Sequence, residues 1–335
     1  MKEIESVAVI GAGLAGLSCA RHLQQQGLEV RLFEKSRGAA GRMSTRRGEG
    51  WQCDHGAQYF TARDPDFRAE VARWQALGVA AVWQPRLEVF GAADLHTPDE
   101  TLERFVGTPR MTAPARSLAL TLDLRLQSTV QRVERSPDGW HLSTAEQGRL
   151  DEAFDALVLA VPAPQAVPLL APHSPALAGL AALARMRAAW ALMLRYDAPL
   201  DLHFDAAFVN HGPLRWVARD SHKPGRGPGE TWLLHATPEW SEAHLEDPPE
   251  AVAEALLAAF ARLGAETAPA AWSAHRWRFA DTEDSLHRNC CWDEDTRIGL
   301  CGDWLNGGKV EGAWLSGRGL ARRIGAAASV MATRP

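Results

Sequence analysis

The sequence lacks the features that mark several classes of protein. It has five cysteines in 335 residues, none of them in a CxxC pair, so neither a disulfide framework nor a zinc site is indicated. Its twelve histidines show no HExxH or similar ligand spacing, so no metal site is expected. No apolar run approaches the roughly eighteen residues of a membrane span, and no basic start with an apolar stretch marks a secretory signal. These absences predict a cytoplasmic protein without a membrane segment.

The sequence also lacks a large net charge of either sign. The net charge is −5 at pH 7, with 23% charged and 46% hydrophobic residues. This is the composition of an ordinary soluble globular protein, and it provides no general attraction to nucleic acid. Two tyrosines stand against thirteen tryptophans, which offer large flat surfaces for core packing or for a planar ligand. The length allows a sizeable core divided between more than one lobe.

What the sequence does contain begins with a glycine motif between two predicted strands. Ser6–Ile10 predicts a buried strand, and residues 29–33 predict a second strand that ends on Glu34. Gly11-Ala12-Gly13-Leu14-Ala15-Gly16 follows the first strand directly, and residues 17–26 predict a helix. Strand, GxGxxG turn, helix, strand and acidic residue together form the dinucleotide-binding fingerprint.

Each glycine of that fingerprint, and the acidic residue after it, has an expected physical role in this chain. Gly11 permits a tight turn, Gly13 lets a pyrophosphate approach the backbone, and Gly16 lets helix and strand pack closely. The helix N-terminus offers free N–H groups and a partial positive charge to the phosphates. The Glu34 carboxylate is expected to accept hydrogen bonds from both hydroxyls of a ribose.

A second glycine signal selects among dinucleotides. Arg37-Gly38-Ala39-Ala40-Gly41-Arg42 comes shortly after Glu34. Here the chain resembles the FAD-binding side of the amine-oxidase-like flavoproteins, and the resemblance implies that Arg42 contacts an FAD phosphate, a bidentate role that lysine fills less well. The alternative is a solvated basic loop, because Arg46 and Arg47 lie nearby in the sequence. A plain NAD-dependent dehydrogenase has no standard need for this turn.

The middle of the chain predicts a second lobe inserted into the nucleotide-binding domain. The expected elements are a helix from 65 to 77, strands over 82–90 with a bend at Pro85, a strand pair near 124–134, a hairpin turn at 137–139, a strand at 154–160, a helix around 176–186, strands at 190–196 and 231–235, and a helix at 249–263. We therefore expect an α/β fold, α+β overall. It combines a Rossmann-like FAD-binding domain (1–68, 106–165 and 290–335) with a mixed-sheet substrate domain (69–105 and 166–289), as in amine oxidases and p-hydroxybenzoate hydroxylase.

The C-terminal part predicts a return to the cofactor. Residues 297–301 form an expected short strand, Gly302-Asp303 follow it, and Val310 opens a final helix. In FAD proteins of this class such a Gly-Asp places its carboxylate on the ribityl chain. The helix N-terminus, with Val310 and Glu311, then faces the pyrimidine edge of the isoalloxazine. The alternative is that Asp303 is a simple turn or helix-cap residue.

From end to end, the chain resembles the bacterial renalases, a family of FAD-dependent amine-oxidase-like flavoproteins. Beyond the glycine turns and the closing helix, the resemblance rests on narrower segments: Gly56-Ala57-Gln58-Tyr59-Phe60-Thr61-Ala62-Arg63-Asp64, Ser221-His222-Lys223-Pro224-Gly225-Arg226, His235-Ala236-Thr237 and His275-Arg276-Trp277. It implies oxidation of the 2- and 6-dihydro isomers of NAD(P), with hydride transfer to flavin N5 and reoxidation by O2 that yields NAD(P)+ and H2O2. Because a dihydropyridine becomes aromatic on losing hydride, no general base or other catalytic side chain is expected.

The resemblance also implies two sets of site residues. The expected cofactor contacts are Gly11, Ala12, Gly13, Leu14, Ala15, Gly16, Glu34, Lys35, Arg42, Met43, Gln58, Tyr59, Phe60, Val130, Asp303, Val310 and Glu311. The expected substrate pocket is Tyr59, Phe60, His235, His275 and Trp277, although buried aromatic residues are more often core.

Several weaker candidates accompany these sets. Arg63, Arg226 and Arg278 are candidates for contact with the substrate's phosphates or carboxamide, with simple exposure as the alternative. Cys301 lies on the strand before the final helix and is poorly placed for a covalent link, so a dissociable, non-covalent FAD is expected.

Two other functions remain compatible with these residues. One is a true amine oxidase on the same scaffold, and the other is a non-catalytic binding protein, since the fold also hosts prenyl-protein escorts. The expected partners are a small-molecule dinucleotide and O2, with neither nucleic acid nor membrane. The sequence does not indicate the oligomeric state, the preferred dihydro isomer, or a preference between NAD and NADP.

Overall fold

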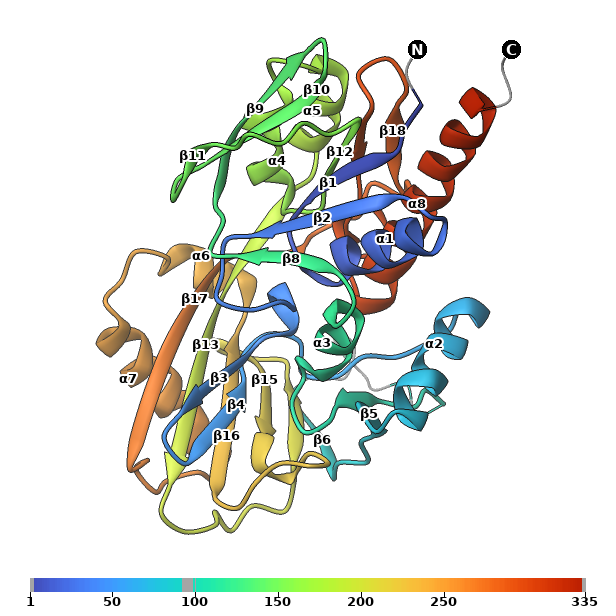
Figure 1. Ribbon diagram of the computed structural model, residues 1–335. Coiled ribbons are helices and arrows are strands. Elements are labelled where there is room, and N and C mark those ends of the chain that lie inside the picture. The colour runs from blue at the N-terminus through green and yellow to red at the C-terminus, as the bar shows by residue number, and fades with distance from the viewer. Residues whose placement is uncertain (1–2, 92–98, 100, 333–335) are drawn as a thin grey trace. The chain divides into compact units, whose positions relative to one another are not determined.

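The computed structural model divides into two compact units, each assembled from several stretches of chain (Figure 1). The structure describes residues 3–91, 99 and 101–332. Unit 1 contains the chain up to residue 41, residues 115–186 and the chain from residue 282; unit 2 contains residues 42–114 and 187–281. Within the described residues, no helix is both long enough and apolar enough to cross a membrane.

The core of unit 1 is a six-stranded sheet in the order β18-β19-β12-β1-β2-β8. Its strands are β1 (Ser6–Ile10), β2 (Glu29–Glu34), β8 (Asp123–Leu126), β12 (Ala156–Leu159), β18 (Cys291–Asp293) and β19 (Ile298–Leu300). Neighbouring strands are parallel except β18 and β19, which are antiparallel. Val7, Ala8 and Val9 of β1 are fully buried, as expected for a central parallel strand covered on both faces.

Two helices of unit 1, α1 (Leu14–Gln25) and α8 (Val310–Ala332), lie side by side (Figure 1). Ser18 Oγ donates a hydrogen bond to the Trp314 carbonyl at 2.8 Å. A Cβ at Gly317 would lie 2.0 Å from the Ala15 carbonyl oxygen, so only glycine permits this close approach.

A second layer shares a hydrophobic core with the parallel sheet of unit 1. It consists of α4 (Ala163–Leu170), α5 (Pro175–Ala182) and the sheet of β9 (Val130–Ser136), β10 (Gly139–Thr144) and β11 (Gly148–Arg149). Trp140 and Leu142 of β10 are fully buried there, so this layer is an integral part of unit 1.

Unit 2 is built on a mixed six-stranded sheet in the order β17-β13-β16-β15-β14-β6. Its strands are β6 (Leu87–Phe90), β13 (Met186–Tyr196), β14 (Ala206–Val209), β15 (Leu214–Arg219), β16 (Glu230–Ala236) and β17 (Ala271–Thr282). The pairs β13–β16, β15–β16 and β14–β15 are antiparallel, whereas β6 and β14 are parallel. Helix α7 (Pro249–Ala261) packs on this sheet, with Phe260 against Trp232 in the core.

Smaller elements complete unit 2. β3 (Thr45–Gly48) and β4 (Trp51–Asp54) form a two-stranded antiparallel ribbon, and β5 (Ala80–Val82) pairs with β7 (Phe105–Gly107). Asp64 caps the N-terminus of α2 (Pro65–Ala76), where its side chain accepts hydrogen bonds from the backbone N–H groups of Asp66 and Phe67. The remaining helices are α3 (Ala113–Ala119), which contains the 114/115 boundary between units, and α6 (Pro238–Ala243).

The structure confirms the predicted fold class and corrects several details. The hairpin at 137–139 is present, and the predicted stretch 82–90 is interrupted around Pro85, between β5 and β6. The strands near 124–134 do not pair with each other: β8 joins the parallel sheet and β9 a separate one. β17 was not predicted, because its residues are mostly half-buried and show no simple alternation of polar and apolar side chains.

The compact units also differ from the predicted domain ranges. Residues 42–68 fall in unit 2, where Cys53 of the ribbon packs with apolar residues of the large sheet. Residues 166–186 fall in unit 1, because α4 and α5 share its core. The predicted ranges include residues 92–98 and 100, which lie outside the described residues.

Candidate functional site

The glycine loop of unit 1 has the geometry that a dinucleotide phosphate requires. Gly11 has φ of 102°, and a Cβ there would meet the Ala160 carbonyl oxygen at 2.5 Å. At Gly16 a Cβ would lie 2.0 Å from the Gly11 carbonyl oxygen, so this glycine lets the helix pack on the strand. A Cβ at Gly13, in contrast, would meet no atom within 4 Å. The loop therefore leaves open space at the position where a pyrophosphate approaches the backbone.

Glu34 lies at the end of β2 beside this loop. Its Oε2 accepts the Ala12 N–H at 2.9 Å, and its Oε1 accepts the backbone N–H and the hydroxyl of Ser36 at 2.8 and 2.7 Å. The residue is 8% exposed. Because each carboxylate oxygen has two lone pairs, these bonds leave acceptor capacity for a ribose while fixing the carboxylate's orientation.

The second glycine turn folds back onto the first. Ala40 forms a β-bridge with Gly13, and the Ala40 N–H donates to the Ala12 carbonyl at 3.0 Å. Ala40 has φ of 117°, a conformation that alanine rarely adopts, so the turn is held there under strain. Lys35 beside it is exposed. Within unit 1 the glycine loop and the Ala40 turn thus contact each other directly, although they are separate motifs in the sequence.

The C-terminal signals lie in the same unit. Asp303 begins a single 3-10 turn (Asp303–Leu305) and is 6% exposed, and its carbonyl accepts the Gly308 N–H at 2.9 Å. Val310 and Glu311 are half-buried at the start of α8. The predicted Val130 contact begins β9 and packs at the margin of the unit 1 core. The glycine loop, the acidic residue at the end of β2 and the C-terminal helix are the elements that a dinucleotide flavin requires, and they follow one another in the expected order.

The remaining predicted cofactor residues belong to unit 2. Arg42 donates to the Ala280 carbonyl at 3.3 Å, and its own carbonyl accepts the Ala57 N–H at 2.8 Å. A Cβ at Gly56 would lie 1.9 Å from that Arg42 carbonyl oxygen, which explains the glycine at this position. Met43 is 3% exposed. The Arg42 backbone therefore anchors the start of the segment that carries Gln58 and Tyr59.

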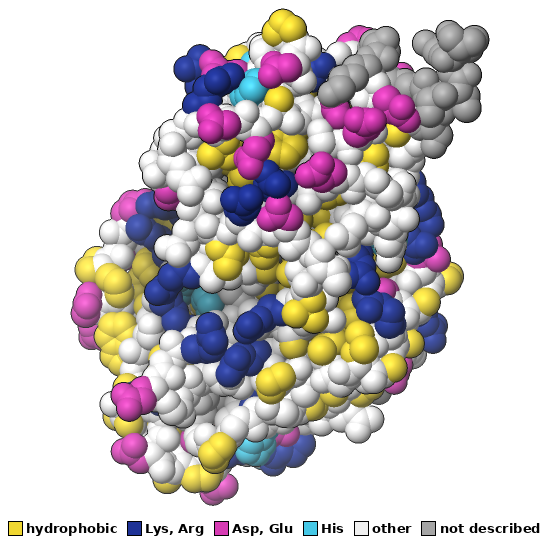
Figure 2. All heavy atoms as spheres, viewed as in Figure 1, with side chains coloured by type: hydrophobic (Ala, Val, Ile, Leu, Met, Phe, Trp, Pro, Cys, Tyr) yellow, Lys and Arg dark blue, Asp and Glu magenta, His cyan; other side chains and the backbone are white. Residues whose placement is uncertain are grey.

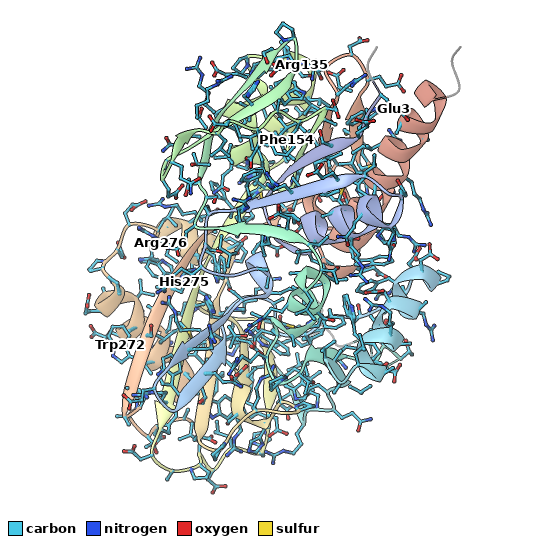
Figure 3. The ribbon with its side chains drawn as sticks, viewed as in Figure 1. Glu3, Arg135, Phe154, Trp272, His275 and Arg276 are labelled. Carbon is cyan, nitrogen blue, oxygen red and sulfur yellow. The ribbon has the colours of Figure 1, made fainter. Side chains whose placement is uncertain are left out.

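Three of the five predicted pocket residues lie together in unit 2, around a residue that was not predicted. The His55 ring stacks on Trp277 with centroids 5.2 Å apart, and the His275 ring stands edge-on to His55 at 4.8 Å and to Trp277 at 4.4 Å. The His55 carbonyl accepts hydrogen bonds from Trp277 Nε1 at 2.8 Å and from His235 Nε2 at 3.1 Å. We call His55, His235, His275 and Trp277 the histidine cluster. Figure 3 labels His275 on β17.

The histidines of this cluster are neutral at physiological pH. Burial, followed by the neighbouring His275, Arg46 and His235, lowers the pKa of His55 to about 3. Burial also lowers the pKa of His235 to about 4, and burial together with Arg46 lowers that of His275 to about 4. Arg46 Nη2 lies 3.2 Å from His275 Nδ1, so the unprotonated nitrogen of this ring accepts from the guanidinium. His55 Nδ1 and Arg46 Nε are buried without a hydrogen-bond partner in the described structure.

Arginines continue from this cluster along the β3–β4 ribbon. Figure 2 shows basic side chains gathered over this part of unit 2. Arg46 and Arg47 lie on β3, Arg110 donates to Gln52 Oε1 of β4, and the Arg195 guanidinium lies over the Trp51 ring at 5.3 Å. We call these four residues the arginine ribbon. Among the described residues, none of the four has an acidic partner within ion-pair distance.

Tyr59 and Phe60 lie in different surroundings. The Tyr59 ring contacts Trp83 and Trp216 at 6.4 and 5.5 Å, with the Arg104 guanidinium 5.6 Å away. Phe60 is 3% exposed and packs against Phe67, Trp74 and Phe105. The Phe60 side chain thus belongs to an aromatic core beside α2, which agrees with the alternative noted from the sequence.

The arginines suggested for substrate contact have partners inside unit 2. Arg226 differs most from the expectation: its side chain is 1% exposed and is committed to Asp54 and to the Gly107 carbonyl. Arg278 is paired with Glu246, and Arg63 lies 3.8 Å from Asp99. The Gln58 amide also points inward, where its Nε2 donates to the carbonyls of Asp54 and Gly56.

His55 and Arg46 are the residues that the sequence did not single out. His55 sits in the stretch 54–60, whose polar and aromatic residues without periodicity do suggest a ligand-lining loop. Its partner residues lie 180 and 222 positions further along the chain, so no local pattern pairs them. Arg46 stands in a run of basic residues that is equally typical of a solvated loop.

Comparison with known proteins identifies the family. Residues 9–74 match the NAD(P)-binding Rossmann-like domain, and residues 66–325 match the flavin containing amine oxidoreductase family. The bifunctional protein MnmC of tRNA 5-methylaminomethyl-2-thiouridine biosynthesis from Magnetococcus marinus is 28% identical over 218 residues, which is 51% of this chain and 31% of that protein. Hydroxyneurosporene desaturase from Rubrivivax gelatinosus is 36% identical over 115 residues, 30% of this chain and 22% of the enzyme. The chain thus spans less than a third of the length of these curated relatives.

Solved structures agree on the fold. Cyclohexylamine oxidase from Brevibacterium oxydans IH-35A superimposes with a TM-score of 0.74 at 15% identity, covering 97% of this chain and 99% of that one. Putrescine oxidase bound to putrescine gives a TM-score of 0.69 at 15% identity, with coverages of 98% and 99%. At such identities the likeness supports the fold alone. Because the family match spans most of the chain, the protein belongs to the flavin containing amine oxidoreductase family.

Proposed function

We propose that the protein is an oxidase of dihydronicotinamide dinucleotides that carry the extra hydrogen at the 2- or 6-position. It would return NAD(P)+ while O2 becomes H2O2. The observation that carries this proposal is the arginine ribbon, which runs into a cluster of neutral histidines. Such a surface suits an electrically neutral ring attached to anionic phosphates.

The charges disfavour the main alternative substrate. An alkylamine is a cation at neutral pH and is best received by a carboxylate without a partner. The carboxylates near the histidine cluster are already paired: Asp54 with Lys223 and Arg226, and Asp281 with Arg215. Arg46 beside His275 would repel an ammonium group, whereas the phosphates of a dinucleotide would gain from the ribbon.

The family segments support the same conclusion by their position. Trp277 and His235 both donate to the His55 carbonyl, and a Cβ at Gly56 would lie 3.5 Å from the Trp277 ring. Lys223 donates to Gln58 Oε1 at 3.1 Å. The four narrower segments of the resemblance therefore meet at residues 54–58, although they are far apart in the sequence.

This chain's own residues would bind and orient rather than transfer protons. We expect the loop around Gly13 and the Glu34 carboxylate to hold the diphosphate and ribose of FAD. The chemistry that bound FAD supplies is acceptance of the hydride that leaves the dihydropyridine, followed by delivery of two electrons to O2, which takes up two protons. The substrate becomes an aromatic nicotinamide cation and loses no proton, so neutral His55, His235 and His275 need only form hydrogen bonds and ring contacts.

We also propose that the flavin is held without a covalent bond. Cys301 is fully buried, and its hydrogen bond with Cys19, together with burial, raises the pKa of its thiol well above the usual range. A thiol that stays protonated is a poor nucleophile, so this residue is unsuited to a flavin link.

The test is anaerobic mixing of the yellow protein with candidate donors. We expect 2- or 6-dihydro-NAD(P) to bleach the flavin absorbance within seconds and the released nicotinamide to be the ordinary oxidised dinucleotide. Cyclohexylamine and putrescine serve as the amine panel. Faster bleaching by an amine would establish the amine oxidase instead, and purified protein that stays colourless after reconstitution with FAD would favour a binding protein.

A further inference from the structure

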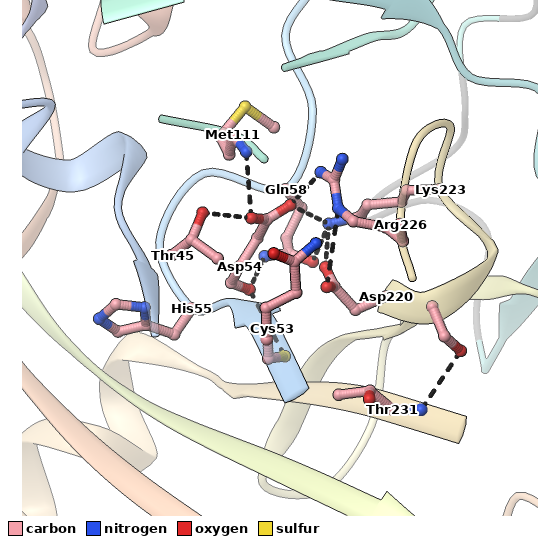
Figure 4. A network of polar contacts seen from close by, with 12 residues as sticks. Thr45, Cys53, Asp54, His55, Gln58, Met111, Asp220, Lys223, Arg226 and Thr231 are labelled. Carbon is pink, nitrogen blue, oxygen red and sulfur yellow. Dashed lines mark hydrogen bonds and ion pairs between the residues drawn. The ribbon is translucent and has the colours of Figure 1, made fainter. Parts of the chain in front are cut away.

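A cluster of four ionised side chains is buried inside unit 2 (Figure 4). The side chains of Asp54 and Lys223 are 0% exposed, and those of Asp220 and Arg226 are 1% exposed. Lys223 Nζ lies 2.8 Å from Asp220 Oδ1 and 3.3 Å from Asp54 Oδ2, and Arg226 also pairs with Asp54. We call these four residues the buried ion cluster. The proposed function gives it no role.

The charges of this cluster depend on one another. Burial alone would raise the pKa of Asp54, but the positive charges of Lys223 and Arg226 outweigh it and lower the pKa. Burial and the Asp54 charge raise the pKa of Asp220. Ion clusters of this kind are weak contributors to stability, because well-packed apolar residues often serve as well. Stability alone therefore does not explain the cluster, and the contacts of the lysine indicate another role.

Lys223 has a third partner outside the cluster. Its Nζ donates to Gln58 Oε1 at 3.1 Å, and this contact turns the Gln58 Nε2 back toward the Asp54 and Gly56 carbonyls at 2.6 and 3.1 Å. The lysine thus closes a small loop over residues 54–58. The opposite side of the same segment is held by the bonds from His235 and Trp277 to the His55 carbonyl.

We propose that Lys223 is a positioning residue that fixes residues 54–58 through Gln58, so that the His55 ring stays stacked on Trp277 and beside His275. The proposal rests on the proposed function only in taking the histidine cluster as the substrate-facing site. Lys223 itself contacts neither substrate nor cofactor. Its effect passes through one amide side chain and one short segment of backbone.

The experiment separates two properties of Lys223: its hydrogen bond to Gln58 Oε1, which we call the tether, and its positive charge. Lys223→Met removes both and leaves two buried carboxylates against one arginine, so this variant will be unstable. Lys223→Met/Asp220→Asn restores the charge balance but not the tether. Gln58→Leu removes the tether and leaves every charge in place. The matched control is Arg219→Met/Glu230→Gln, which neutralises another buried pair of unit 2 with side chains 7% and 3% exposed.

Two readouts are taken on the FAD-loaded proteins. Hydrogen exchange of the peptide that contains residues 54–60 reports the tether directly, and anaerobic flavin reduction is followed with whichever donor reduces the wild type fastest. We expect Gln58→Leu and the Lys223→Met/Asp220→Asn double variant to exchange faster in this peptide than wild type, and to lower the limiting rate of reduction severalfold. All variants should be reduced by dithionite at the wild-type rate. The Arg219→Met/Glu230→Gln control should match wild type in both the exchange of this peptide and the limiting rate of reduction.

Failure of this proposal is distinct from failure of the proposed function. If dihydronicotinamides do not reduce the flavin of the wild-type protein, the substrate assignment is wrong. The hydrogen-exchange readout would still test the positioning role of Lys223. If the Lys223→Met/Asp220→Asn variant recovers wild-type exchange and reduction along with its thermal stability, the lysine serves charge balance alone and the positioning role is excluded.

Discussion

The two units assemble their functional residues by different means. In unit 1 the glycine loop, the Ala40 turn and the Ala12–Glu34 bond are made mostly by backbone atoms within about forty residues of chain. In unit 2 the histidine cluster and the buried ion cluster are made by side chains from four separate stretches of sequence. Backbone sites leave a trace in local sequence because only certain residues permit the geometry. Side-chain sites become visible only after folding.

The largest expected effect tests the backbone site. Gly13→Val should fold normally, because a Cβ at Gly13 meets no atom within 4 Å, yet flavin should be lost on purification since the side chain fills the space meant for the pyrophosphate. Flavin content and thermal unfolding of the apoprotein are the measurements. Gly16→Val is the contrasting variant, since a Cβ at Gly16 would lie 2.0 Å from the Gly11 carbonyl oxygen and folding itself should suffer. A yellow, fully loaded Gly13→Val protein would contradict the phosphate role of the loop.

A smaller effect is expected at the acidic strand end. Glu34→Ala removes the expected ribose acceptor and the partner of the Ala12 and Ser36 N–H groups, so FAD affinity should fall by about 1–3 kcal/mol. Titration of apoprotein with FAD measures this loss. Glu34→Gln keeps one acceptor oxygen, so its FAD affinity should lie between those of the wild type and Glu34→Ala. Unchanged affinity in Glu34→Ala would mean that the carboxylate serves only the loop.

The arginine ribbon offers a sharper test of unit 2. Arg47→Ala and Arg195→Ala should each raise the KM for a dihydronicotinamide dinucleotide, with little change in kcat, because exposed charge contacts contribute about 0.2–1 kcal/mol each. The effect should shrink at high salt, and it should be smaller for dihydronicotinamide mononucleotide, which lacks the adenosine-side phosphate of the dinucleotide. Unchanged KM values in both variants would place the phosphates elsewhere.

The last test concerns the pH dependence of stability. His55, His235 and His275 have pKa values of about 3, 4 and 4 in the folded protein, below the ordinary value of 6.5. The unfolded chain therefore binds more protons below pH 6.5, and stability should decline as the pH falls from 6.5 toward 4. Asp220 acts in the opposite direction, because its pKa is raised in the folded state.

Thermal unfolding midpoints measured from pH 7.5 to 4.5 check this balance. The decline should be shallower in His275→Gln and steeper in Asp220→Asn than in wild type. The limiting rate of flavin reduction should show no histidine ionisation between pH 6 and 8. A reduction rate that follows a pKa near 6.5 would show that a charged imidazole takes part.

The sequence predicted unit 1 well because its restrictions are steric and local. Gly11, Gly16 and Glu34 each have a single suitable residue type at a fixed spacing, and the structure gives a contact that explains each one. The histidine cluster was predicted in part, through His235, His275 and Trp277, while its centre at His55 was missed. The reason is physical: His55 is defined by two bonds to its backbone carbonyl, and a carbonyl group is present at every position.

Buried charges were the least predictable part. Lys223 and Asp54 are 169 positions apart, and a lysine beside a proline and a glycine is as typical of an exposed turn as of a buried pair. Arg226 was expected at the substrate for the same reason, because sequence alone does not report whether a guanidinium faces solvent. The ion pairs that Lys223 and Arg226 form with Asp54, at the end of β4, decide this only in the folded chain.

The discontinuity of unit 1 bears on how the protein is made. The first 41 residues leave the ribosome long before β12 and β19, which are the next parallel strands on one side of β1. Gly317 of α8, which permits the close packing of α8 against α1, is made later still. Synthesis runs from the N-terminus, so the glycine loop is made well before the strands and the helix that pack around it. A chain interrupted before α8 would therefore present its glycine loop without the helix that packs against α1, and we expect such a chain to hold flavin poorly.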